Sequence, residues 1–189
     1  MAIIAPFHEL ESNFERTIQI EPKMSFGTGH HQTTYMMCES ILDASLAEKT
    51  ILDMGSGTGV LAILCEMKGA KKILAIDIEP WSVENCRKNA VVNNCNRIES
   101  VLGDIEAIIG NRFDVIFANI NKNILLSHMP NYIQALSPNG FLYLSGFFSS
   151  DAQEIKEIAE GLGLSFFSKR EREGWCMICL LYTSPSPRD

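Results

Sequence analysis

Long apolar runs and basic residues are both scarce in this sequence of 189 residues. No run approaches the roughly 20 apolar residues that a membrane-spanning helix needs, and the first residues lack the basic start of a signal peptide. Lys and Arg number 16 against 23 Asp and Glu, which gives a formal net charge of −7. Because clustered basic side chains are what neutralise phosphates, we predict no direct nucleic-acid partner and no membrane partner. The expected location is cytoplasmic.

The cysteines do not follow the pattern of a disulfide framework. Six are scattered through apparent helices and strands, which is typical of reduced thiols in a cytosolic protein. The C-x-x-C match from Cys176 to Cys179 lies inside an apolar strand, without a second pair. His30 and His31 are adjacent, a spacing at which two side chains do not easily face one ion, and no carboxylate or cysteine stands at ligand spacing. We therefore predict no metal site.

The middle of the chain alternates apolar strands with helices. Short apolar runs are followed by segments with apolar residues at helical spacing, and turn residues separate the two. A single domain is expected at this length. The predicted strands are residues 50–53, 72–77, 98–102, 113–118 and 141–145, and the predicted helices are residues 58–67, 81–92, 123–136 and 151–162.

The last two predicted strands differ from the others. Residues 164–168 and 175–181 are separated only by the charged turn 169–174, which leaves no room for a crossover helix, so we expect them to pair antiparallel. Five parallel strands with alternating helices and this hairpin make an α/β fold, a doubly wound, mostly parallel seven-stranded sheet. Such sheets bind ligands at the carboxyl ends of their strands.

A glycine-rich turn follows the first predicted strand, in the stretch Asp53-Met54-Gly55-Ser56-Gly57-Thr58-Gly59. Glycines remove the Cβ atoms that would hold a ligand away, and the helix that follows offers N–H groups to a carboxylate or phosphate. Asp77 ends the next strand, where a carboxylate accepts hydrogen bonds from ribose hydroxyls. Asp104 ends the third, either as acceptor for an adenine amino group or as a turn aspartate. Together they predict an adenosine-type cofactor.

Two cofactors are compatible with the glycines alone. Gly57 to Ala62 satisfies the permissive dinucleotide pattern G-x-G-x-x-G/A, which keeps a nicotinamide-dependent oxidoreductase open. Asp53 favours a different ligand, because a carboxylate there faces a pyrophosphate unfavourably, whereas it helps to hold an ammonium or sulfonium group. S-adenosylmethionine carries both cations, and its own carboxylate suits the helix N-terminus.

These residues resemble class I S-adenosylmethionine-dependent methyltransferases, and the upstream segment narrows the resemblance. Residues 22–34 read PKMSFGTGHHQTT, similar to the P-x-x-x-F-G-T-G-x-H-x-T-T signature of the ribosomal protein L11 methyltransferase (PrmA) family. The resemblance runs on through the glycine turn to about residue 146 and covers residues 20–181. It implies a methyltransferase domain at residues 23–181. Residues 1–22 would be a linker or the remnant of a further domain, and residues 182–189 a disordered or artefactual tail.

The resemblance also implies an activity and its site residues. The implied reaction is direct transfer of the sulfonium methyl group to lysine and N-terminal amines of ribosomal protein L11. Thr34, in a helix running to about Leu42, would reach the methionyl end of the ligand or serve as a helix cap. Asn119 would face the reactive end or be a turn residue, and no catalytic base is assignable. The implied cofactor contacts are Thr34, Gly55, Gly57, Asp77 and Asn119, with the loop 26–29 nearby.

Three other interpretations stay open. The substrate is another protein or a small molecule, or the enzyme is the oxidoreductase described above. Alternatively, the chain is a cofactor-binding module, inactive without the separate N-terminal domain that family members carry and of which nearly all is missing here. After Asn119 the sequence also lacks the N-P-P-Y clamp of many amine methyltransferases, as does the family itself. We expect a monomer.

Overall fold

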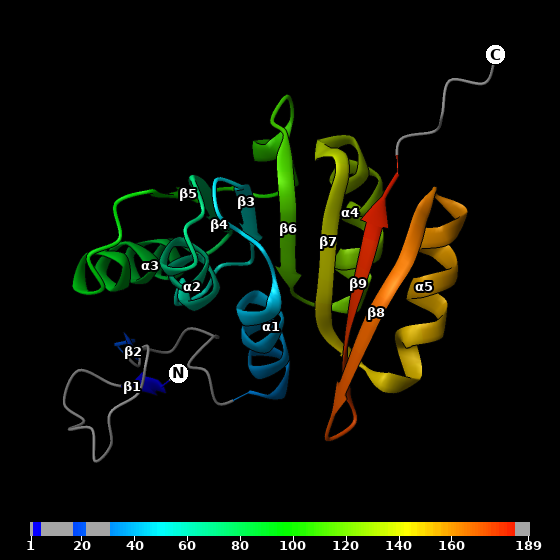
Figure 1. Ribbon diagram of the computed structural model, residues 1–189, viewed down its shortest axis with the longest axis horizontal. Coiled ribbons are helices and arrows are strands. Elements are labelled where there is room, and N and C mark those ends of the chain that lie inside the picture. The colour runs from blue at the N-terminus through cyan, green and yellow to red at the C-terminus, as the bar shows by residue number, and fades with distance from the viewer. Residues whose placement is uncertain (1, 5–16, 22–30, 184–189) are drawn as a thin grey trace.

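The structure, a computed structural model, describes residues 2–4, 17–21 and 31–183 (Figure 1). Its centre is a seven-stranded sheet with the order β5-β4-β3-β6-β7-β9-β8. The first five of these strands run parallel, and β9 pairs antiparallel with both of its neighbours. The expected doubly wound sheet with a terminal hairpin is therefore confirmed. The strands are β3 (Thr50–Met54), β4 (Lys72–Asp77), β5 (Ile98–Leu102), β6 (Phe113–Asn119), β7 (Leu136–Phe148), β8 (Leu164–Arg172) and β9 (Trp175–Tyr182).

Helices cover both faces of this sheet (Figure 1). On one face α1 (Gln32–Asp43) and α2 (Val60–Met67) share a buried core with the sheet, and α3 (Pro80–Val92) joins it. On the other face lie α4 (Lys122–Ala135) and α5 (Ala152–Gly161). No helix within the described residues is long and apolar enough to cross a membrane. Two short 3₁₀ helices complete the elements of the sheet domain, η1 (Ile105–Ile108) and η2 (Ser149–Asp151).

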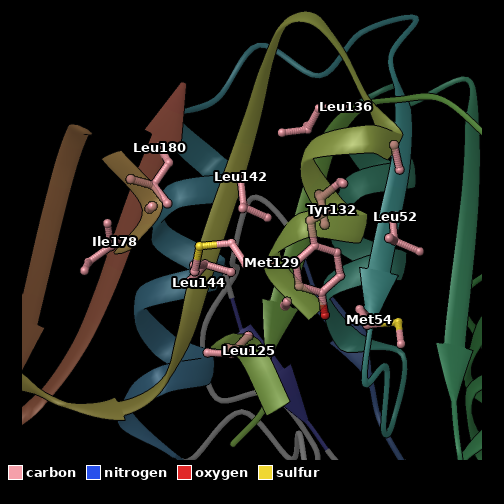
Figure 2. Packing of buried hydrophobic residues seen from close by; sticks show 14 of the residues in the cluster. Leu52, Met54, Leu125, Met129, Tyr132, Leu136, Leu142, Leu144, Ile178 and Leu180 are labelled. Carbon is pink, nitrogen blue, oxygen red and sulfur yellow. The ribbon is translucent and has the colours of Figure 1, made fainter. Parts of the chain in front are cut away.

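The core beneath α4 shows how one helix is fixed to the sheet (Figure 2). Leu125, Met129 and Tyr132 stand four and three residues apart, so they share one face of the helix and are fully buried. Leu142 and Leu144 of β7 alternate toward the same face of the sheet. Burying each large apolar side chain contributes about 1.5–3 kcal/mol. This packing holds the N-terminus of α4 beside the carboxyl ends of the parallel strands.

The terminal hairpin is longer than predicted. β8 continues past the expected end at residue 168 to Arg172, which leaves only Glu173 and Gly174 between the strands. β8 is the edge strand of the sheet, and an edge strand tolerates charged side chains because its outer side faces water. The charges at residues 169–172 therefore belong to a strand and not to a loop.

β7 also begins earlier than the predicted residue 141. Phe113 pairs with Leu136 and Val115 with Phe141, so residues 137–140 form an irregularity inside the paired strand. The Ser-Pro-Asn-Gly signal does mark a local turn, since Asn139 has a positive φ of 61°. β7 is paired with β6 on both sides of that turn, so the strand extends across it.

Residues 17–21 pack against the sheet domain. They belong to residues 1–22, which were expected to be a linker or the remnant of a further domain. β2 (Thr17–Gln19) pairs parallel with β1 (Ala2–Ile4). Ile18 and Ile20 are 0% and 3% exposed and belong to the same core as α1 and α2. In an extended chain alternate residues face one side, so both isoleucines reach that core together.

Candidate functional site

The glycine loop lies at the carboxyl end of β3, before α2. The backbone N–H groups of Gly55 and Ser56 donate to the Ile76 carbonyl at 2.9 and 3.0 Å. The N–H of Gly57 donates to Asp77 Oδ2 at 2.9 Å. These three donors are thus used within the protein, and the loop offers a backbone surface whose shape is fixed by β4. The expectation that the helix after the glycines offers its N–H groups to a ligand stays a prediction.

Asp77 ends β4 and lines a large pocket beside the loop. Its Oδ2 accepts the Gly57 N–H, and its Oδ1 accepts the Glu79 N–H at 2.9 Å. Each carboxylate oxygen has two lone pairs, so both can accept a further hydrogen bond. The two backbone donors hold the carboxylate in one orientation. Asp77 therefore lies in the position that ribose binding requires, and the contact itself stays a prediction.

Asp53 does not line the pocket. Its side chain is only 1% exposed and turns beneath the loop, where Oδ2 accepts the Ala62 N–H at 3.2 Å in the first turn of α2. Burial raises the pKa of this carboxyl to about 7. We expected Asp53 to help hold a ligand cation, but in the structure its carboxylate binds the first turn of α2. It serves this helix in place of a capping side chain, because the N-cap residue, Gly59, has none.

α1 brings Thr34 to the pocket. The helix is capped by His31, whose Nδ1 accepts the Thr33 N–H at 3.3 Å and lies 2.8 Å from Thr33 Oγ1. Thr34 is therefore not the cap, and its buried side chain lines the pocket, as His31 does. His30 and the loop 26–29 lie outside the described residues.

Asn119 ends β6, and it too lines the pocket. It pairs with Ser145 of β7, and the next residue, Ile120, donates its N–H to the Ser145 carbonyl at 3.2 Å. The Ile120 side chain fills the space that a Cβ on Gly55 would need. The end of β6 is thereby packed against the glycine loop, and this contact places Asn119 and the loop on one pocket.

Asp104 is a capping residue that also lines the pocket, and its contact with an adenine amino group stays a prediction. Its Oδ1 accepts the Ile105 N–H at 2.8 Å and so caps η1. It also lines the pocket, and His128 Nε2 of α4 lies 3.6 Å from the same oxygen. The Tyr132 hydroxyl stands 3.4 Å from His128 Nδ1. His128 was not predicted, because on a helix its single position carries no motif.

Trp175 is a further pocket residue that the sequence did not reveal. It opens β9 and lines the pocket, with its ring centroid 4.7 Å from that of His31 and 4.3 Å from that of Phe148. β9 runs antiparallel to β7 with Trp175 opposite Phe148. The first residue of such a strand reaches the edge where parallel strands end, and the hairpin geometry is the signal from which this placement follows.

The pocket has a volume of about 690 Å³. The described residues that line it include the carboxylates of Asp77, Glu79 and Asp104 and no lysine or arginine. Ser56 also lines it, and the buried Ser56 Oγ has no hydrogen-bond partner within the described residues. The acidic lining favours a cationic ligand over an anionic one.

The described residues contain no cluster of three metal-ligating side chains. All six cysteines are free thiols. Burial raises the pKa of both Cys176 and Cys179 to about 11. Such thiols stay protonated at neutral pH, and a protonated thiol is a poor nucleophile and metal ligand.

The sequence and the fold match one family of proteins. The family model described as ribosomal protein L11 methyltransferase (PrmA) matches residues 1–182. The ribosomal protein L11 methyltransferase of Phocaeicola vulgatus is 43% identical over 177 residues, which cover 93% of this chain and 63% of that protein. The one from Bacteroides thetaiotaomicron is 41% identical, over 95% of this chain and 65% of that protein. The chain thus spans a little under two thirds of the length of these relatives.

Solved structures agree with this assignment. The crystal structure of the ribosomal protein L11 methylase from Lactobacillus delbrueckii subsp. bulgaricus matches with a TM-score of 0.88 and 27% identity, covering 96% of this chain and 94% of that one. A methyltransferase from Pyrococcus furiosus matches with a TM-score of 0.70 at 20% identity, which shows a shared fold. This chain belongs to the ribosomal protein L11 methyltransferase (PrmA) family.

Proposed function

We propose that this chain binds S-adenosylmethionine and transfers its methyl group to amine nitrogens of ribosomal protein L11. The observation that carries the proposal is the acidic pocket at the carboxyl ends of the parallel strands, beside the glycine loop. Carboxylates attract a ligand that carries ammonium and sulfonium groups. They repel the pyrophosphate of a nicotinamide dinucleotide, so the acidic lining argues against the oxidoreductase alternative.

Each end of the cofactor has residues that suit it. Asp77, held by two backbone donors, would accept hydrogen bonds from the ribose hydroxyls. Asp104 would accept one from the adenine amino group. Thr34 and Asn119 would hold the methionyl end, and Gly55 and Gly57 let the backbone come close.

The proposed role of Asp53 is indirect. It ties the first turn of α2 to β3 and so fixes the loop without touching the ligand.

The chain's own contribution to catalysis is alignment in a pocket with little water. When bound, the cofactor supplies an electrophilic methyl group on its sulfonium. Thr34 and Asn119 would hold the methionyl end so that this methyl group faces the acceptor nitrogen, and the proton lost by the methylated nitrogen would pass to solvent. Holding the reacting atoms in line contributes several kcal/mol. A lysine acceptor, with a pKa near 10.4 in water, must first lose a proton, and desolvation lowers that pKa.

The length of the relatives bears on substrate recognition. Since the chain spans only 63% of the Phocaeicola vulgatus protein, we propose that residues 23–181 form the methyltransferase domain and that recognition of L11 needs the rest of the family's length. A cofactor-binding fragment without activity is the second candidate, and the same coverage favours it. We further propose that the protein acts in the cytoplasm, as a monomer, without direct contact to nucleic acid or membrane.

Titration calorimetry tests the cofactor. S-adenosylhomocysteine, the product form, should bind the chain, whereas NADH should not bind. Tight binding of NADH without binding of S-adenosylhomocysteine would overturn the cofactor assignment.

Methyl transfer tests the substrate. Labelled S-adenosylmethionine is incubated with purified L11 and either this chain or the chain fused to the upstream region of a longer relative. Transfer by both proteins supports the proposed function, and transfer by the fusion alone supports the fragment. Transfer by neither, with the cofactor bound, would point to a different acceptor.

A further inference from the structure

Residues 17–21 are held to the domain by two asparagine side chains, that of Asn89 in α3 and that of Asn93, the C-cap of this helix. Asn93 Oδ1 accepts the Gln19 N–H at 2.9 Å, and Asn93 Nδ2 donates to the Gln19 carbonyl at 2.7 Å. One turn earlier, Asn89 Oδ1 accepts the Glu21 N–H at 3.0 Å. A single amide thus binds both backbone groups of Gln19, as a neighbouring strand would do.

Asn89 also contacts the glycine loop. Its Nδ2 donates to the Thr58 carbonyl at 2.9 Å, and the side chain is only 1% exposed. The two bonds require the same orientation of the amide, because Glu21 offers a donor and Thr58 an acceptor. Asn93 Nδ2 donates in turn to the Asn89 carbonyl at 2.7 Å. The hydrogen bonds therefore form a continuous path from Gln19 to the glycine loop.

The loop and α3 are also in direct contact. A Cβ on Gly59 would lie 2.5 Å from the Cys86 Sγ, and Gly59 has a φ of 80°. Cys86 and Asn89 stand three residues apart, so they lie on one face of α3. Thr58 and Gly59 thus both contact α3, so a shift of this helix would disturb the glycine loop.

We propose that Asn89 and Asn93 are positioning residues that couple the docking of residues 17–21 to the conformation of the glycine loop. A bound cofactor restricts the glycine loop. The loop fixes the Asn89 amide through the Thr58 carbonyl, and the amide fixes residues 17–21 through the Glu21 N–H. Because such coupling is reciprocal, the docked segment raises cofactor affinity by the same factor. Residues 17–21 thereby communicate with the cofactor site, although no described residue from 2–4 or 17–21 lines the pocket. This inference rests on the proposed binding of S-adenosylmethionine.

The test compares the whole chain with its Asn93→Ala variant. Amide exchange at Gln19 and Glu21 is followed by nuclear magnetic resonance with and without S-adenosylhomocysteine, and affinity is measured by calorimetry. In the unchanged chain the ligand should slow exchange at both amides. Asn93→Ala should speed exchange at Gln19 and weaken ligand binding by at least about fivefold, although Asn93 does not line the pocket.

Two further variants separate coupling from general loss of stability. Lys88→Ala removes an exposed side chain of the same helix and should change neither readout. Asn89→Ala should weaken ligand binding more than Asn93→Ala does, raising KM for S-adenosylmethionine without lowering kcat at saturation. If Asn89→Ala does not fold, Asn93→Ala still decides the outcome.

The inference is overturned if the unchanged chain binds S-adenosylhomocysteine while Asn93→Ala binds it equally well. It is also overturned if the bound ligand leaves exchange at Gln19 and Glu21 unaltered. If the unchanged chain binds no S-adenosylhomocysteine, the proposed function fails, and the coupling fails with it.

Discussion

The two sides of the pocket are built in different ways. The nucleotide side, formed by Gly57, Asp77 and Asp104, comes from three strand ends that follow one another in the sequence. The aromatic side, formed by His31 and Trp175, with the ring of Phe148 against that of Trp175, joins the start of α1 to β7 and β9. The nucleotide side is held by hydrogen bonds between backbone N–H groups and carboxylates, whereas the aromatic side is held by ring contacts.

The two sides differ in how far apart their partners lie in the sequence. The bonds of the nucleotide side join residues at most 20 positions apart, on neighbouring elements of one strand–helix–strand unit and its following strand. The rings of the aromatic side meet only because α1, β7 and β9 come together in the folded sheet. If the proposed function holds, the nucleotide side governs cofactor affinity and the aromatic side governs transfer to the acceptor.

Replacing Asp77 should have the largest effect. Asp77→Ala removes the acceptor of two backbone N–H groups and of the proposed ribose contact, and should weaken S-adenosylhomocysteine binding by about 100-fold, since hydrogen bonds to charged groups contribute about 1.5–3 kcal/mol each. Calorimetry measures this. Glu99→Ala on the neighbouring strand is the control and should bind as the unchanged chain does. Equal affinity of Asp77→Ala would remove Asp77 from the site.

Gly59→Ala should lower the free energy of unfolding by straining the glycine loop on the nucleotide side. The residue has a φ of 80°, and the added Cβ would lie 2.5 Å from Cys86 Sγ. Strain of this kind costs about 1–3 kcal/mol, and urea unfolding measures it. The double variant Gly59→Ala/Cys86→Ala should recover part of the loss, because it removes the collision and keeps the positive φ. No recovery would mean that backbone strain alone is responsible.

Asp53 should make stability depend on pH. Burial raises the pKa of its carboxyl to about 7 in the folded chain, above its ordinary value near 3.9. The folded state therefore binds the proton more tightly than the unfolded state, and stability falls as pH rises from about 4 to about 7. Between pH 5 and pH 7 the free energy of unfolding of the unchanged chain should fall by about 2 kcal/mol more than that of Asp53→Asn. The same pH dependence of this free energy in both proteins would contradict the assignment.

Trp175→Ala tests the aromatic side and should have the smallest effect. It removes the ring that contacts His31 and Phe148, and should lower kcat for methyl transfer about tenfold, because misplacing reacting groups reduces alignment. Affinity for S-adenosylhomocysteine should change by less than about threefold. A variant that loses cofactor affinity as strongly as Asp77→Ala would erase the distinction between the two sides. The exposed Phe167→Ala serves as control.

Much of the fold followed from the sequence, and the misses have a common cause. The parallel strands, the helices between them and the antiparallel hairpin were predicted because their signals lie within short windows. The charges at residues 169–172 were assigned to a loop, since only the sheet order shows β8 to be an edge strand. The packing of residues 17–21 was not predicted, because their buried isoleucines find their partners in distant helices.

The sequence alone determined the glycine turn, the positions of Asp77 and Asp104 at strand ends and the family signature near Thr34, because adjacent residues fix turn and strand-end geometry. Only the tertiary structure decided that Asp53 lies beneath the loop, that Trp175 stands against His31 and that Asn89 joins residues 17–21 to Thr58. Each of these depends on sheet order, strand register and helix packing, which bring together residues far apart along the chain. Local chemistry thus predicts the ligand class, and long-range packing completes the site.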